Sequence, residues 1–168
     1  MSAAPSTGPE RGLGTRLRHL LELLDGDVEA IYREAGLAGY RPRYTPVVRV
    51  LAERGEASLK AIAAAAGTSH SAISQTVAQM TRAGLVALRP GADARERLAS
   101  LTPAARALLP RLQAIWADTD AAALALENDA DAPAALSTAI DAAIAALERS
   151  PFRDRIRAQR ARSTAHRR

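Results

Sequence analysis

The fold of this chain is decided by residues 59–88, which read LKAIAAAAGTSHSAISQTVAQMTRAGLVAL. Within this stretch, Leu59 and Ile62 share one face of a short helix, and Gly67 supplies the backbone freedom that a tight turn needs. Ser69 is placed to cap a second helix, because a serine side chain there accepts a hydrogen bond from the first turn. The stretch therefore predicts two short helices joined by a turn and followed by a strand.

The second of these helices has two chemically different faces. Ile73, Val77 and Met80 recur at positions i, i+4 and i+7, which places one stripe in a core. The opposite face carries hydroxyl, amide and guanidinium groups, from Ser71, Gln75 and Arg82. Residues 69–82 contain no carboxylate. Such a helix is chemically suited to the major groove of DNA, and we interpret it as a recognition helix.

Direct readout of bases requires donors and acceptors near the N-terminal end of such a helix. Glutamine can pair with adenine through two hydrogen bonds, and hydroxyl groups can bind either a base edge or a phosphate. We therefore predict DNA contacts from Ser69, His70, Ser71, Ser74, Gln75, Gln79 and Arg82. The alternative is a solvated polar face, which we would favour for an isolated helix but not in this helix-turn-helix context.

A leucine-rich helix is predicted near the N-terminus, after 12 residues that we expect to be disordered. From Leu13 to Ile31, large apolar residues recur at three- and four-residue spacing, which indicates a helix of about 22 residues. Residues 25–27, Asp-Gly-Asp, are poor helix formers, so a bend or break there is one expectation. The apolar seam needs a partner surface, and either folding back or pairing with a second copy would provide one.

The connection to the next helix is basic. Because Arg41 precedes a proline, we expect an extended link there. Thr45 followed by Pro46 predicts a capped helix start, and Gly55 marks the end of that helix. For Arg41 and Arg43 two interpretations stay open, a clamp on DNA phosphates and a solvated loop.

A change of period after Gly84 predicts a β-hairpin. Residues 85–88 form a short strand, a Pro-Gly turn follows, and residues 95–101 return as a second strand. We expect Arg95 and Arg97 to share one face of the return strand and to be DNA-contact candidates. The alternative is ordinary surface charge or an ion pair with a neighbouring acid.

Two amphipathic helices and a basic tail are predicted after the hairpin. Thr102 followed by proline opens a long helix, and residues 134–147 form a last helix with leucine and isoleucine at helical spacing. Residues 151–168 contain seven arginines and one aspartate, a net charge of +6, and we expect this tail to be poorly ordered at its end. It either extends a DNA contact electrostatically or keeps the protein soluble.

Charge and composition narrow the function classes. Residues 41–97 carry nine Lys or Arg against four acids, a net charge of +5, whereas residues 104–148 carry two Arg against seven acids, a net charge of −5. A basic middle segment favours a polyanionic partner. The absence of cysteine excludes disulfides, thiolate zinc sites and thiol-based redox sensing. No run of residues suggests a secretion signal or a membrane span, so we expect a cytoplasmic protein, nucleoid-associated when DNA-bound.

No catalytic, cofactor or metal site is expected. We find no nucleophile with a nearby base and no phosphate-binding loop. His19 and Glu22 lie one helical turn apart, but a metal site built on them is rejected because the chain has three histidines and no cysteine. Trp116, the single tryptophan, either lines a ligand cleft or packs the helix seam, and packing is the better interpretation.

The order of these elements resembles the multiple-antibiotic-resistance regulator (MarR) family of winged-helix transcription factors over roughly residues 13–147. The stretches that carry the resemblance are GTSHSAISQTVAQMTRAGLV at 67–86, Asp-Ala-Arg at 93–95 and LTPAAR at 101–106. The resemblance implies a mainly α-helical, winged helix-turn-helix fold with a two-stranded wing and long dimerisation helices. The implied DNA-binding lobe spans about residues 41–101, and the implied dimerisation helices span 13–35 and 102–148. The basic C-terminal tail, residues 150–168, is not part of the common pattern of the family.

The resemblance also implies a function. It indicates a homodimer that binds double-stranded DNA at a pseudo-palindromic operator, with the wing residue Arg95 in or beside the minor groove. Many members of the family bind an aromatic or anionic effector, so a ligand-responsive repressor is the leading hypothesis. An architectural DNA-binding protein without an effector is the alternative, and a winged helix that has become a protein-interaction module is a third hypothesis.

Overall fold

The structure is a computed structural model that describes residues 12–91, 93, 96–127 and 136–165. The chain divides into two compact units, Met1–Ala117 and Asp118–Arg168, which we describe separately. The elements of the first unit are α1 (Leu13–Glu34), the 3₁₀ helix η1 (Pro42–Tyr44), α2 (Thr45–Arg54), β1 (Glu56–Ser58), α3 (Leu59–Ala65), α4 (His70–Arg82), β2 (Val86–Pro90) and β3 (Arg97–Leu101). Helix α5 (Pro103–Glu127) begins in the first unit and ends in the second, which also contains α6 (Leu136–Arg149) and α7 (Phe152–Ala165).

The predicted helix-turn-helix is confirmed as α3 and α4. Ser58 and Ser69 cap these helices, accepting hydrogen bonds from the backbone N–H of Ala61 and Ala72, each over 3.2 Å. Gly67, at φ +60°, adopts the left-handed backbone that the turn between them requires. The apolar residues of α3 and α4 pack with those of α2 in one core, so the turn chemistry and the apolar pattern specify the same local structure.

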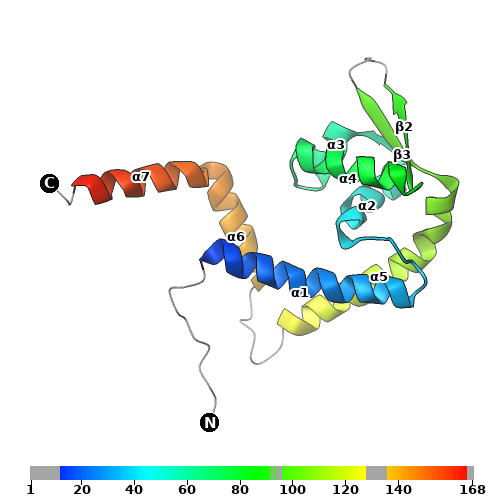
Figure 1. The fold of residues 1–168 in the computed structure, drawn as a ribbon, viewed down its shortest axis with the longest axis horizontal. Helices are drawn as coiled ribbons and strands as arrows, with labels where there is room; N and C mark the ends of the chain where they lie inside the picture. The colour runs from blue at the N-terminus through cyan, green and yellow to red at the C-terminus, as the bar shows by residue number, and fades with distance from the viewer. Residues whose placement is uncertain (1–11, 92, 94–95, 128–135, 166–168) are drawn as a thin grey trace, which may run out of the picture. The chain divides into compact units, whose positions relative to one another are not determined.

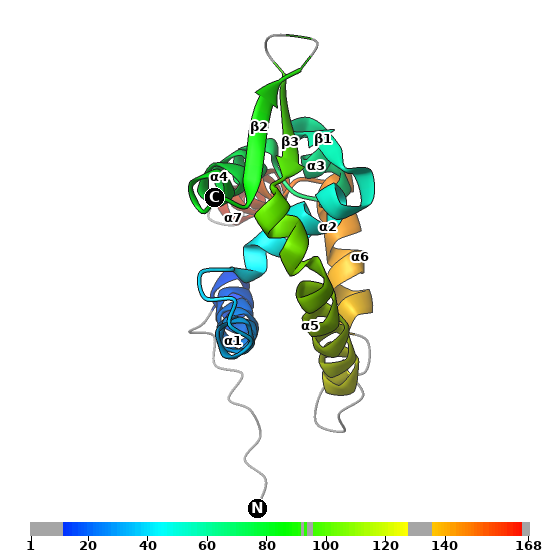
Figure 2. The same ribbon diagram turned by 90° about the vertical axis from the view of Figure 1, so that its right-hand side faces the viewer.

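The predicted wing hairpin is confirmed as β2 and β3, and a third strand, β1, which the sequence did not predict, extends it into a three-stranded sheet. Its strand order is β1-β3-β2, and both pairings are antiparallel, with Ala57 opposite Ala99 and Leu88 opposite the same residue. Strand β1 has three residues between two helices, too short to show strand alternation, and it exists only because β3 pairs with it. Figure 2 shows the β2–β3 hairpin projecting away from α3 and α4.

The start of α2 differs from the prediction. Residues 42–44 form η1 instead of an extended link, and Thr45 lies inside the helix rather than at its cap. The Thr45 hydroxyl is 3.1 Å from the Tyr32 hydroxyl and 3.5 Å from that of Tyr40. Thr45 is thus used in a tertiary contact, which local capping rules do not anticipate.

Helix α1 runs without interruption through residues 25–27, so the expected break is absent (Figure 1). Near its end, Tyr32 is 1% exposed and accepts a hydrogen bond from Trp116 Nε1 over 3.1 Å. Tyr40 packs edge-to-face against both Tyr32 and Tyr44. Trp116 is 8% exposed, which confirms packing as its role.

The basic tail is largely helical. Helix α7 follows α6 after a corner at Ser150 and Pro151 and extends to Ala165, and the end of the tail, for which we expected poor order, lies outside the described residues. Arg155 donates hydrogen bonds to the carbonyl oxygens of Ala146 and Ser150, over 3.0 and 3.2 Å, and so holds the beginning of α7 against the end of α6. Among the described helices, none combines the length and the apolar character needed to cross a membrane.

Candidate nucleic-acid interface

One side of α4 is buried in the core, and the opposite side faces solvent. Ile73, Val77 and Met80 are at most 3% exposed and pack in the core of the first unit. At 100° per residue, the positions opposite this stripe form a ridge along the helix. That ridge consists of Ser71, Gln75, Ala78 and Arg82, all of them exposed. The predicted readout residues Ser71, Gln75 and Arg82 are therefore brought together on one accessible face.

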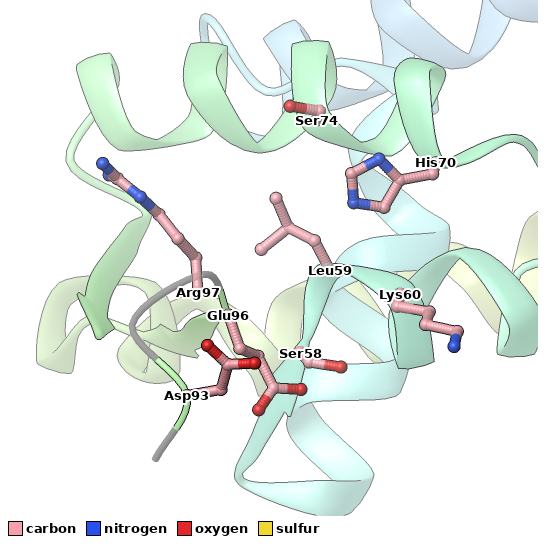
Figure 3. Close-up of a pocket in the computed structure, with 8 residues that line it drawn as sticks. All are labelled: Ser58, Leu59, Lys60, His70, Ser74, Asp93, Glu96 and Arg97. Atoms are coloured by element: carbon pink, nitrogen blue, oxygen red, sulfur yellow. The ribbon is translucent and has the colours of Figure 1, made fainter. Parts of the chain in front are cut away.

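A groove runs beside this ridge, between α4 and the wing, with a volume of about 760 Å³. Its lining residues are Ser58, Leu59, Lys60, His70, Ser74, Asp93, Glu96 and Arg97. Figure 3 shows His70 and Ser74 on the α4 side, with Arg97, Asp93 and Glu96 on the wing side. The structure thus gathers three of the predicted DNA-contact residues, His70, Ser74 and Arg97, around one groove.

The groove has mixed charge. Lys60 and Arg97 contribute cations, and the carboxylates of Asp93 and Glu96 lie on the wing side. Lys60 is not among the predicted contacts, although an exposed lysine in the first turn of the first helix of a helix-turn-helix is a usable signal for a phosphate contact. Ser58 is the N-cap of α3, and nothing in the sequence placed it at the groove.

The wing arginines have different environments. Arg97 is exposed at the start of β3. Arg89 of β2 donates hydrogen bonds from two guanidinium nitrogens to the carboxylate of Glu56 in β1, and this ion pair raises the pKa of Arg89 above its ordinary value. Arg89 therefore links two outer strands of the sheet. Arg95 lies outside the described residues, so its predicted contact stays a prediction.

The two arginines before α2 are both engaged within the chain. Arg41 forms an ion pair with Glu29 of α1, and the Arg43 guanidinium lies 5.7 Å from the centre of the Tyr44 ring. Arg41 is thus an exposed residue with an ion-pair partner in the chain, and its phosphate contact stays a prediction. The ion pair was not foreseen because Glu29 and Arg41 meet only through the packing of η1 beside α1.

Gln79 differs from the rest of the predicted set. It is half-buried, and its Oε1 atom is buried without a hydrogen-bond partner among the described residues. The amide oxygen therefore faces the protein rather than the solvent side of α4. On α1, the His19 and Glu22 side chains approach to 4.0 Å, and the described residues contain no group of three metal-ligating side chains.

Comparisons with known proteins agree with this geometry. A family model described as MarR family matches residues 38–96, which contain the helix-turn-helix and most of the wing. A MarR-family regulator from Silicibacter pomeroyi has a similar structure, with 25% identity, a TM-score of 0.52, and coverage of 80% of this chain and 93% of that chain. Residues 38–96 therefore form a MarR-family domain.

Two further MarR-like structures have the same fold. The Mycobacterium tuberculosis transcriptional regulator MosR, solved in complex with DNA, is 21% identical, with a TM-score of 0.67 and coverage of 83% of this chain and 98% of that one. The second is BpsR from Bordetella bronchiseptica, whose DNA binding is regulated by 6-hydroxynicotinic acid. It is 19% identical, with a TM-score of 0.55 and coverage of 85% of this chain and 100% of that one. Comparison with curated protein sequences gives no match.

The match of residues 38–96 to the MarR family indicates a DNA-binding transcriptional regulator rather than an enzyme. The recognised family and the mainly helical winged helix-turn-helix fold confirm the two broadest expectations from the sequence. The individual DNA-contact residues remain predictions.

Proposed function

We propose that this MarR-family protein is a homodimeric, sequence-specific repressor that binds a pseudo-palindromic operator and is released by a small molecule. The observation that carries the DNA-binding part is the exposed, carboxylate-free face of α4. Ser71 and Gln75 lie one helical turn apart on it, at the spacing of side chains that reach successive base edges. We expect Gln75 to read adenine and Ser71 to bind a base edge or a phosphate.

Contacts with the DNA backbone would come from both sides of this face. Ser69, His70 and Ser74 lie near the N-terminal end of α4, where backbone N–H groups also favour anions. Arg82 lies at the far end of the ridge, and Arg97 with Lys60 lies at the groove beside the wing. We propose phosphate contacts for these cations and a minor-groove contact for Arg95. Arg41, Arg43 and Gln79 are weaker candidates because each is engaged or partly buried within the chain.

The homodimer is supported by the uncovered leucine face of α1. Leu13, Leu17 and Leu24 are 63%, 45% and 43% exposed, although they follow one another at helical spacing on one face. A contiguous apolar face of this kind marks an interaction surface. A second copy of the chain is the partner we propose, because two recognition helices at a fixed distance would read the two half-sites of a palindrome.

We also propose that an aromatic or anionic small molecule acts as an effector and releases the protein from DNA. This proposal rests on the description of the related BpsR, whose DNA binding is regulated by 6-hydroxynicotinic acid. In this chain the corresponding coupling would pass through Tyr32, Thr45 and Trp116, which connect α1, α2 and α5 by hydrogen bonds. We propose that the protein is cytoplasmic and acts on chromosomal DNA.

A fluorescence-anisotropy titration tests the proposal. The probes are the DNA immediately upstream of the gene for this chain and a scrambled duplex of equal length and composition. We expect tighter binding to the upstream DNA and release on addition of 6-hydroxynicotinic acid or a related aromatic acid. Equal, steeply salt-dependent affinities would favour an architectural protein, and absence of binding at low salt would favour a protein-interaction module.

A further inference from the structure

Helix α7 is an ordered, strongly basic element outside the helix-turn-helix and wing. It contains 14 residues, Phe152–Ala165, and at 1.5 Å per residue it is about 21 Å long. Its only acid is Asp154, in the first turn, where a carboxylate interacts favourably with the helix dipole. Figure 1 shows α7 continuing from α6 beyond a corner.

The corner between α6 and α7 is held by one arginine. Arg155 donates from Nε to the Ser150 carbonyl and from a terminal nitrogen to the Ala146 carbonyl. These carbonyls lie at the end of α6, and that of Ala146 also accepts a hydrogen bond from the Ser150 backbone N–H over 3.1 Å. Arg155 therefore has a structural role, and α7 has a defined direction relative to α6.

Three further arginines of α7, Arg153, Arg157 and Arg162, face solvent. Arg153 and Arg157 are 74% and 77% exposed, lie on one face at positions i and i+4, and share the single carboxylate of Asp154 at 3.8 and 3.3 Å. Two guanidinium groups with one carboxylate leave an uncompensated positive charge. Arg162 is also exposed farther along the helix.

We propose that α7 binds the phosphate backbone of double-stranded DNA through Arg153 and Arg157. This inference rests on the proposed function, which brings the chain to DNA, and it adds a sequence-independent contact to it. Arginine pairs with phosphate through two parallel hydrogen bonds and is a common residue in such contacts. Charge complementarity therefore favours a polyanion as the partner.

A membrane surface is the less suitable polyanion. Helices that lie in a bilayer interface carry an apolar face along their length. In α7 the exposed large apolar residues, Phe152 and Ile156, are confined to the first two turns. The rest of the helix offers only alanines and polar residues, so it lacks the apolar surface that insertion requires.

The test compares three variants of the full chain in anisotropy titrations between 50 and 200 mM salt. Arg153→Gln with Arg157→Gln removes the proposed contacts. Arg16→Gln with Arg18→Gln, on exposed positions of α1, makes the same change in net charge elsewhere. Asp154→Asn removes the carboxylate that the two arginines share, while Arg155 and its corner hydrogen bonds are left in place. Circular dichroism confirms that each variant is folded.

The α7 double variant should lose affinity equally for the upstream DNA and for the scrambled duplex. Two lost phosphate contacts lower the salt slope by about 1.8 for each protomer, or about 3.6 for the proposed dimer, which corresponds to an affinity change between 50 and 200 mM salt that is about 150-fold smaller. Asp154→Asn should increase affinity, and the α1 control should leave the slope unchanged. An unchanged slope in the α7 variant, or a loss matched by the α1 control, would overturn the inference.

Two further outcomes separate this inference from the proposed function. If the wild-type protein does not prefer the upstream DNA, the sequence-specific function fails, yet the α7 contact is still measured on the scrambled duplex. Vesicles containing phosphatidylserine serve as the second polyanion. Binding to them that is lost in the α7 double variant, with no change in DNA affinity, would assign the helix to a membrane and overturn the DNA contact.

Discussion

Trp116 of α5 and Tyr32 of α1, 84 positions apart in sequence, are joined by a hydrogen bond of 3.1 Å from the indole nitrogen to the phenol oxygen. The same oxygen lies 3.1 Å from the Thr45 hydroxyl at the start of α2. Three helices therefore share one buried polar atom. Because α3 and α4 pack on α2, the hydrogen bonds of the Tyr32 hydroxyl connect the helix-turn-helix to α1, which precedes it, and to α5, which follows it.

Replacing Tyr32 with phenylalanine should destabilise the fold. The change removes one hydroxyl and leaves the Trp116 N–H buried without its acceptor, which costs about 1–3 kcal/mol of the free energy of unfolding. Urea denaturation measures the loss. Tyr44→Phe is the matched control, since no hydrogen bond of the Tyr44 hydroxyl is found among the described residues, and it should change stability by less than about 0.5 kcal/mol. Equal losses in both variants would contradict the role assigned to the Tyr32 hydroxyl.

Stability should fall at high pH because of Tyr40. Burial raises the pKa of Tyr40 above its ordinary value of 10.0. A group whose pKa is higher in the folded state contributes stability that is fully present below the unfolded-state pKa and is lost as the pH rises above it. Unfolding free energies measured from pH 8 to 11 should therefore decrease above about pH 10, and Tyr40→Phe should show a weaker decrease. Identical pH profiles would be inconsistent with this assignment.

Gly84 and Gly26 should respond in opposite directions to alanine. Gly84 ends α4 at φ +71°, a left-handed conformation in which a Cβ is strained, so Gly84→Ala should cost about 1 kcal/mol. Gly26 lies within α1 with open space around the position of an added Cβ, so Gly26→Ala should stabilise by about 0.5–1 kcal/mol. Thermal unfolding of the two variants checks both signs.

The two kinds of DNA contact should separate in mutants of α4 and the wing. Gln75→Ala should reduce the preference for the upstream DNA by about 1–3 kcal/mol, because it removes a base contact. Arg97→Gln should weaken binding to all sequences alike and flatten the salt slope of the proposed dimer by about 1.8, because it removes one phosphate contact from each protomer. If Gln75→Ala weakened both duplexes equally, the recognition role of α4 would have to be abandoned.

A single carboxylate on the leucine face of α1 should disrupt the proposed dimer. Leu17→Glu places two like charges in the interface of a symmetric dimer, where burial of unpaired charge is costly. Thr15→Glu introduces the same group on the opposite side of the same helix and serves as the control. Light scattering should give a monomer mass for the first variant and a dimer mass for the second. A dimer in both would exclude this face from the interface.

Local features of the sequence were sufficient for the helix-turn-helix. The Ser58 and Ser69 caps, the turn at Gly67 and the apolar stripe of α4 all act within a few residues, so their physics can be read directly from the order of the amino acids. The same stripe determines which side chains of α4 face outward. The exposed positions of Ser71 and Gln75 follow from it without knowledge of the rest of the fold.

Only the tertiary structure decided the features that depend on residues far apart in the chain. Strand β1 forms because β3 pairs with it, the Glu29–Arg41 ion pair depends on η1 packing beside α1, and Thr45 joins two tyrosines instead of capping its helix. Each depends on loop closure and packing, which short-range periodicity does not encode. The sequence by itself determined that this chain has a recognition helix with an exposed polar face. The tertiary structure determined which arginines outside that helix, such as Arg41 and Arg89, are paired with carboxylates of the chain.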